Sequence, residues 1–240
     1  MKGHERKKLK SDKTKWRITW LVVLITGMLV LHACKRKTGE ATDLKQEYFP
    51  TALGQWVIYD VIDIRHDINH DTLSYQLKEI IADDFIDNSG RLAQRIERYV
   101  RTTEADPWTI SDVWHSVRTT RSAEKVEEDV RFVKMEFPMN EFKSWDGNVY
   151  NQYVKWEYFY DSLDYSGSVG TLEFDSLAFV THRQNSNFVE YEQAYEVYAK
   201  HIGLVQKQLI DLDVRSGAIV LDSIIKGIEL YQTVVSYGND

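Results

Sequence analysis

The stretch WVIYDVIDI, residues 56–64, decides the fold class of this chain. Four of its apolar side chains share one side of the segment: Trp56, Ile58, Ile62 and Ile64. Asp60 lies on the same side and interrupts this row. Apolar residues that recur with a period of two indicate a β-strand, whereas a helix repeats them about every 3.6 residues. The stretch therefore predicts a strand.

The same period continues along the chain. The polar turn IDNSGR, residues 86–91, separates two further apolar rows and predicts a hairpin between them. Later rows are aromatic, and the last one, IELYQTVVSYG, is rich in β-branched residues. About ten such strands predict an antiparallel meander, which must curl so that its edges are closed or covered.

We therefore expect an all-β domain made of a single antiparallel, strongly curved sheet, a barrel or half-barrel, after an N-terminal signal helix. One segment, VEEDVRFVKMEFP at residues 126–138, changes phase and predicts a bulge or bend near Phe132. Outer-membrane barrels alternate in a similar way, but Asp60, Gln94 and Arg98 interrupt the apolar rows. A charge that faces lipid at the midplane costs roughly 2 to 4 kcal/mol, so we favour a domain that lies in water.

The N-terminal segment predicts export. Eight bases and two acids precede residue 18, and residues 18–31 carry no charge. This length suits the apolar region of a signal peptide and is short of the roughly 20 residues that a spanning helix needs. Ala33 offers a small residue for cleavage before Cys34.

Leu31, His32, Ala33 and Cys34 resemble the lipobox of bacterial lipoproteins, with His32 in place of the usual small or aliphatic residue. The resemblance implies cleavage before Cys34 and acylation (palmitate among the chains) of this residue, the only cysteine in the chain. Several acyl chains hold a protein firmly on a membrane without spanning it. We expect a signal peptide at 1–33, a lipidated cysteine and tether at 34–53, and the β domain at 54–240.

The charge of the mature part excludes one class of partner. Removing the leader's eight bases and two acids from the chain's 30 and 37 leaves 22 bases and 35 acids, a net charge of about −13. Affinity for nucleic acid comes mainly from Lys and Arg that neutralise phosphates. We therefore expect no nucleic-acid partner.

Catalytic and metal-binding patterns are absent from the sequence. HDINHD, residues 66–71, has ligand-type residues, but we interpret it as a polar turn because nothing identifies further ligands. Ser168 lacks the context of a nucleophile elbow, and no cysteine remains after lipidation. We assign no catalytic residue, metal or cofactor, so enzyme activity has no support.

The run SWDGNVYNQYVKW, residues 144–156, offers candidate ligand-binding residues: Trp145, Asn148, Asn151 and Trp156. Aromatic rings and amides stack on and hydrogen-bond to small ligands. Packing of a loop onto the sheet is the competing explanation for the same residues.

Five further stretches resemble a group of uncharacterised Bacteroidota-type lipoproteins: GQWVIYDV (54–61), WTISDVWHS (108–116), FVKMEFP (132–138), WDGNVYN (145–151) and VYAKHIGLVQK (197–207). The resemblance implies no activity. In lipoproteins an aspartate after the cysteine favours the inner membrane, and Lys35 stands there instead. We expect a lipid-anchored protein of the cell envelope, on the periplasmic face of the outer membrane.

Three functions remain open on the sequence alone. The first, which we favour, is a noncatalytic interaction module, tethered by lipid, that binds an envelope protein or a peptidoglycan-associated partner through a sheet face or edge. The second is a periplasmic carrier that holds a lipid or other apolar ligand on a concave β surface. The third is a hydrolase with a dispersed site. An open apolar cavity favours the carrier, a filled core favours the module, and converging acids and histidines favour the enzyme.

Overall fold

The computed structural model describes residue 16 and residues 42–67, 70–215 and 223–240, and these last three ranges form one compact unit that begins at Asp43. A short 3-10 helix, η1 (Gln46–Tyr48), precedes the strands. The strands within the described ranges are β1 (Gln55–His66), β2 (Asp71–Ile86), β3 (Leu92–Arg101), β4 (Thr109–Arg118), β5 (Ser122–Glu127), β6 (Val130–Glu136), β7 (Ser144–Asp146), β8 (Glu157–Val169), β9 (Leu172–Ser186), β10 (Glu190–Ala199), β11 (Gly203–Val214) and β12 (Ile224–Asn239).

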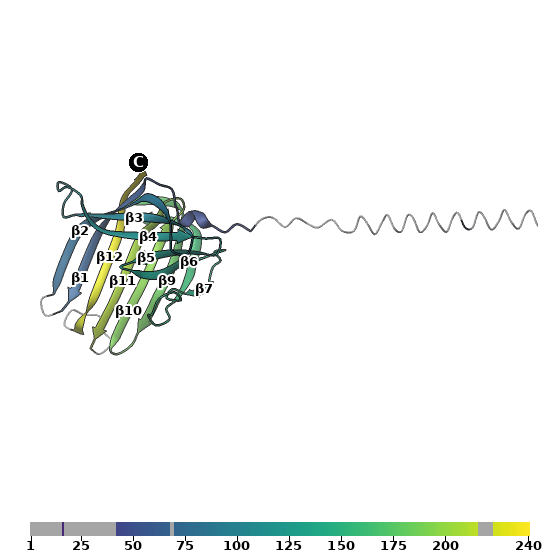
Figure 1. Cartoon of the computed structure of the whole chain (residues 1–240). Coiled ribbons are helices and arrows are strands. Elements are labelled where there is room, and N and C mark those ends of the chain that lie inside the picture. Colours follow the sequence, from purple (N-terminus) through teal and green to yellow (C-terminus); the bar gives the residue numbers. More distant parts are fainter. Residues whose placement is uncertain (1–15, 17–41, 68–69, 216–222) are drawn as a thin grey trace, which may run out of the picture. The chain divides into compact units, whose positions relative to one another are not determined.

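All twelve strands belong to one antiparallel sheet with the order β6-β5-β4-β3-β2-β1-β12-β11-β10-β9-β8-β7. Strands that follow one another in the sequence pair with one another, except β6 and β7, and β1 also pairs with β12, so the first and last strands lie together. The sheet curls until its two edge strands, β6 and β7, lie side by side, and β3, β4 and β5 cross in front of the strands behind them (Figure 1). The predicted all-β class is confirmed, and the form is a nearly closed barrel of twelve strands rather than about ten.

The side of β1 that faces the core is opposite to the side that carries Trp56, Ile58, Ile62 and Ile64. Val57, Tyr59 and Val61 are buried in the core, whereas Ile62 is 43% exposed. Both sides of this strand are apolar, so the pattern alone fixes the strand but leaves its inward side open. The packing partners contributed by the neighbouring strands decide which side is buried.

Two local predictions are confirmed. Asp87, Gly90 and Arg91 form the turn between β2 and β3 through the bonds Asp87 N to Arg91 O and Gly90 N to Asp87 O, both 2.9 Å. The register of β5 against β6 shifts between Ala123 and Glu124, which leaves Lys134 as the extra residue of a bulge on β6. A bulge re-aims side chains, and here the re-aimed side chain is a buried lysine.

The domain begins before the predicted boundary at residue 54. Tyr48 and Phe49 are buried in a core cluster with residues of β6, β8 and β10. The Arg118 guanidinium donates to the backbone oxygens of Gln46 (3.0 Å) and Phe49 (2.7 Å), which fixes this segment on the barrel. The part of the predicted tether from Asp43 onward therefore belongs to the folded unit. Cys34 and the rest of the predicted leader lie outside the described residues.

Among the residues described, none of the helices has both the length and the apolar composition that crossing a bilayer requires.

Candidate ligand cavity

The barrel is incomplete between β6 and β7, an edge that we call the seam. Besides the bonds between the Tyr160 hydroxyl of β8 and the backbone of Glu136, the hydrogen bonds across it include three: Val133 N to Gly147 O (2.9 Å), Trp145 Nε1 to Val133 O (2.8 Å) and Asn151 Nδ2 to Arg131 O (2.9 Å). Two of these come from side chains rather than from a continuous backbone ladder. The seam is therefore held at a few points, by β7 and by the segment 147–156 that follows it, which we call the seam loop.

A cavity of about 610 Å³ lies inside the barrel along the seam. β5, β6 and the seam loop form one wall, and β8, β9, β10 and β11 form the rest. The lining is mainly apolar and aromatic, with Phe132, Tyr153, Val154, Trp156, Tyr158, Ala194 and Leu209 among its members. Ligand cavities in proteins commonly measure about 300 to 1,000 Å³ and combine an apolar lining with a few polar groups.

Four charged side chains on β5, β6, β10 and β11 supply those polar groups, and we call them the charge cluster: Glu127, Lys134, Glu196 and Lys207. The Lys134 ammonium lies 2.9 Å from the Glu127 carboxylate and 3.0 Å from that of Glu196. Lys207 approaches the same two carboxylates at 3.6 and 3.8 Å. The cluster carries two positive and two negative charges, so it is neutral as a unit.

Mutual attraction keeps the charge cluster ionised despite its burial. Burial by itself raises the pKa of Glu196, but the positive charge of Lys134 and contacts with His182 outweigh it and hold this pKa well below its usual range. The pKa of Glu127 is lowered for the same reason, by Lys134 and Lys207. Burial lowers the pKa of Lys134, yet both carboxylates together raise it above its ordinary value. A buried carboxylate and ammonium coexist only where such compensation is present.

His182 of β9 completes the polar part of the cavity. Its ring is stacked on that of Tyr158, with centroids 3.8 Å apart, and only 6% of the residue is exposed. Burial lowers the pKa of His182, so the ring is neutral at neutral pH. Its Nε2 atom lies 3.4 Å from a Glu196 oxygen but without the geometry of a hydrogen bond, and it has no hydrogen-bond partner in the described part of the chain.

The four predicted ligand-binding residues divide into two pairs. Asn148 and Trp156 line the cavity, and the guanidinium of Arg183 stacks on the Trp156 ring at 4.9 Å. Trp145 is buried in the core, where its indole nitrogen bonds across the seam, and Asn151 donates to Arg131 O and to Asn148. The packing of the seam loop and β7 against β6 therefore explains Trp145 and Asn151, which were predicted to bind a ligand.

The sequence pattern did not predict the residues of the charge cluster or His182 as site residues. Each is a polar residue within an otherwise apolar or aromatic row, as in FVKMEFP for Lys134 and AYEVYA for Glu196. Such an interruption is the available signal, but a solvated strand face gives the same pattern. Glu127 and Lys134 belong to the hairpin β5–β6, whereas Glu196 and Lys207 are cross-strand partners in the hairpin β10–β11. The contacts between the two hairpins join segments far apart in the sequence, so the cluster becomes visible only when the sheet has curled.

The structure describes four residues of the stretch HDINHD: His66, Asp67, His70 and Asp71. His66, at the end of β1, is buried, and its Nε2 lies 2.7 Å from the Glu229 carboxylate. In residues 42–67, 70–215 and 223–240, no group of three or more potential ligands converges on one point. His66 is therefore part of a polar pair within the sheet rather than of an exposed turn.

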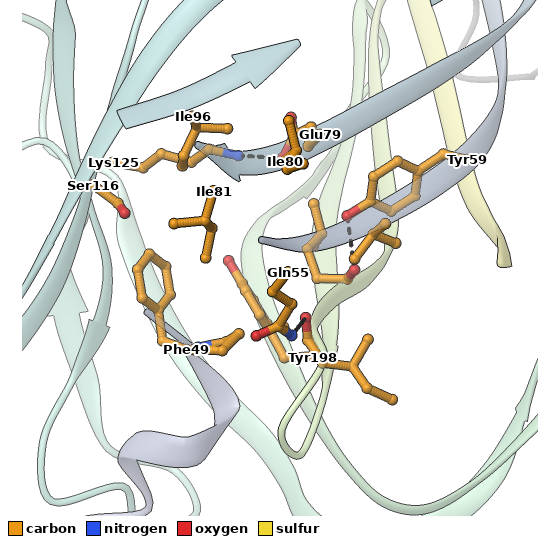
Figure 2. A pocket seen from close by; sticks show the side chains of 15 residues that line it. Phe49, Gln55, Tyr59, Glu79, Ile80, Ile81, Ile96, Ser116, Lys125 and Tyr198 are labelled. Atoms are coloured by element: carbon orange, nitrogen blue, oxygen red, sulfur yellow. Dashed lines mark hydrogen bonds and ion pairs between the residues drawn. The ribbon is translucent and has the colours of Figure 1, made fainter. Parts of the chain in front are cut away.

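A smaller cavity of about 80 Å³ lies between the segment that precedes β1, the strands β1 to β5 and the turn between β10 and β11 (Figure 2). Lys125 of β5 reaches Glu79 of β2 at 2.9 Å beside it, and Phe49, Ile81 and Tyr198 surround the space. The Tyr198 hydroxyl donates to Glu196, so this tyrosine separates the small cavity from the charge cluster. Because this cavity is small and its charged groups are already paired, we interpret it as a gap in the packing of the core rather than as a ligand site.

A third cavity, of about 550 Å³, is bounded by β2, β3 and β4. Arg98, the charged residue at its inner side, bonds to Glu79 at 3.0 Å and to Asp112 at 3.3 Å. Arg101 is likewise bonded, to Gln76 and to the backbone of Glu104. Because these guanidinium groups already have partners, this cavity offers a ligand fewer free donors than the cavity at the seam.

The fold and the cavity define a class, a nearly closed β-barrel with an internal, ligand-sized space that has an aromatic wall and a charged base. No family model, curated protein or solved structure matches this chain. Function must therefore be inferred from the geometry of the cavity itself.

Proposed function

We propose that this protein is a noncatalytic carrier or binding protein that holds a small amphipathic molecule in the cavity at the seam. The observation that carries the proposal is the cavity of about 610 Å³ with an aromatic wall on one part and buried polar groups on another. A molecule with an apolar body and a polar end matches both parts. Burial of its apolar surface would supply the binding free energy, at about 25 cal/mol per Å².

The interaction-module hypothesis has less support, because it predicts a filled interior. The hydrolase hypothesis has some support in that two glutamates and a histidine converge at the cavity. However, the described residues that line it include no serine, threonine or cysteine. Glu127 and Glu196 are weak bases because their pKa values are lowered.

We further propose that Cys34 anchors the carrier to the envelope membrane, on the periplasmic face of the outer membrane. A tethered carrier suits an amphipathic cargo, because such molecules partition into membranes and cross the aqueous space poorly by themselves. Labelled palmitate is expected to enter the protein in cells and to be lost in the Cys34→Ala variant. An unlabelled protein that begins at Met1 would contradict the anchor and would leave the carrier proposal standing.

The carrier proposal is tested by native mass spectrometry of the complete chain, extracted gently from the producing cells. We expect a bound small molecule at one per chain. The Ala194→Phe variant places a ring in the cavity and is expected to lose that molecule, whereas Ala82→Phe, at an exposed position on β2, is expected to keep it. Equal occupancy in the two variants would contradict binding at this cavity.

A further inference from the structure

Lys207 differs from the other lysine of the charge cluster in its bonding. Lys134 lies 3.0 Å or less from both carboxylates, and its hydrogen bond to Glu196 is buried. The Lys207 ammonium lies 3.6 and 3.8 Å from them, beyond hydrogen-bond distance, and makes no hydrogen bond to any described residue. Its side chain is 20% exposed and lines the cavity. Three N–H donors are therefore available to a ligand there.

His182 supplies a second unsatisfied group on the same cavity. Its Nε2 is buried and lacks a hydrogen-bond partner within the ranges described, and a buried polar atom of this kind costs about 1 to 3 kcal/mol. Lys207 and His182 both approach Glu196, at 3.8 and 3.4 Å, so the two groups lie close to the same carboxylate. A ligand atom that accepts hydrogen bonds would satisfy both.

The charges on the cavity wall favour an anion over a cation. Three lining side chains are positive (Lys134, Arg183 and Lys207) and two are negative (Glu127 and Glu196). Both negative groups already have Lys134 as a close partner, and Arg183 is paired with Glu192 outside the lining. The group that lacks a close partner is thus the Lys207 ammonium.

We propose that the cargo carries a compact anionic head group, bound by Lys207 with His182 beside it, while its apolar tail lies along Phe132, Tyr153 and Trp156 toward the seam. This inference rests on the proposed carrier function and adds the chemical class and orientation of the ligand. A carboxylate and a phosphate monoester share the required chemistry. A neutral or cationic head would leave the Lys207 donors unsatisfied.

The test measures binding of four amphiphiles with the same C12 chain to the complete protein by titration calorimetry: dodecanoate, dodecyl phosphate, dodecanol and dodecylammonium. We expect one or both anions to bind about 10- to 100-fold more tightly than dodecanol, the range for a hydrogen bond to a charged group. The comparison between the two anions identifies the head group. Lys207→Gln is expected to reduce the anion's affinity to about that of dodecanol, with the dodecanol affinity unchanged.

Lys226→Gln is the matched control, because Lys226 is an exposed lysine outside the cavity lining whose ion pair among the described residues is with Asp213. It is expected to leave all four affinities unchanged. Unchanged dodecanol binding in Lys207→Gln also shows that the variant is folded. Equal affinities for the anions and dodecanol, or tightest binding of dodecylammonium, would overturn the anionic head group and leave the carrier function intact. Failure of all four to bind would overturn both proposals.

Discussion

Lys134 is the residue on which the interior of the barrel depends most. Its ammonium is within 3.0 Å of two buried carboxylates that repel one another, and only 5% of its side chain is exposed. Removing one partner of a buried ion pair leaves a charge without compensation, whereas removing both is often close to neutral. The contribution of the charge cluster to stability therefore depends on all four charges together and cannot be assigned to a single contact.

We expect Lys134→Met to lower the free energy of unfolding by about 3 to 5 kcal/mol, because Glu127 and Glu196 then share the single charge of Lys207. The double variant Lys134→Met/Glu196→Gln restores one charge of each sign and is expected to recover much of the loss. Urea unfolding measures both values. Lys226→Met, at an exposed lysine, serves as control and should change stability by at most about 0.5 kcal/mol. If Lys134→Met were as stable as the control Lys226→Met, Lys134 would not compensate the charges of Glu127 and Glu196.

Individual site residues were only partly predictable from the sequence. Asn148 and Trp156 were identified because aromatics and amides cluster in a short run, which is a local signal. Lys207 and Glu196 are partners within one hairpin, but their burial and their contacts with Lys134 and Glu127 depend on a hairpin that the chain forms much earlier. A charged residue within an apolar row is ambiguous until its cross-strand neighbours are known.

At the scale of elements, the seam determines how the cavity is bounded. The bulge on β6 places Lys134 inward, and β7 is a strand of only three residues that leaves the rest of this edge to the seam loop. The phase change of the sequence correctly predicted the bulge. The closing of β6 against β7 was not predictable, because it depends on an indole and an amide side chain rather than on strand periodicity.

Gly147 at the start of the seam loop tests this packing. A Cβ atom at this position would lie 2.4 Å from Cζ of Tyr158, a ring that is both core and cavity wall. We expect Gly147→Ala to lower the free energy of unfolding by about 1 to 3 kcal/mol through overpacking. It should also weaken ligand binding, because Tyr158 stacks on His182.

Gly167→Ala is the matched control for that substitution, since its added Cβ would meet its nearest neighbour at 3.5 Å, an ordinary contact. We expect this variant to keep its ligand affinity and to lose markedly less stability. Urea unfolding measures the free energy of unfolding of both variants. A similar loss of stability in Gly147→Ala and Gly167→Ala would show that the seam loop can shift away from Tyr158 without cost.

For the whole molecule, the buried titratable groups predict a stability that falls as the pH is lowered. Burial lowers the pKa of His182 from 6.5, so below that pH the unfolded chain takes up a proton that the folded chain resists. The pKa values of Glu127 and Glu196 are lowered from 4.5, so their contribution is present above that pH and is lost as the pH falls further. The pKa values of Lys134 and Tyr198 are raised, so these two groups lower the free energy of unfolding only above about pH 10.

We therefore expect the free energy of unfolding to be highest between about pH 7 and pH 10 and to fall in two steps on acidification. His182→Gln should reduce the step that begins below about pH 6.5, to which His115 also contributes because burial lowers its pKa, and should leave the lower step unchanged. Urea titrations at fixed ionic strength over pH 3 to 9 measure this profile. Greater stability at pH 5 than at pH 7 would contradict the assigned protonation states.

The overall fold was the most predictable level. A period of two along the chain is a property of each strand, and it gave the all-β class, the meander and the hairpin after β2. The pairing of β12 with β1, and the inclusion of Tyr48 and Phe49 in the core, depend on contacts between distant segments. These features required the structure, as did the cavity that forms when the sheet curls.

The crystal structure of the complete chain with 12-bromododecanoate is the most direct test of the central claim that this cavity holds a ligand. Anomalous scattering locates the bromine at the tail of the molecule. We predict bromine density inside the barrel between Phe132 and Trp156, with the carboxylate at Lys207. A fully occupied bromine site outside the barrel, with the cavity free of ligand density, would contradict the account.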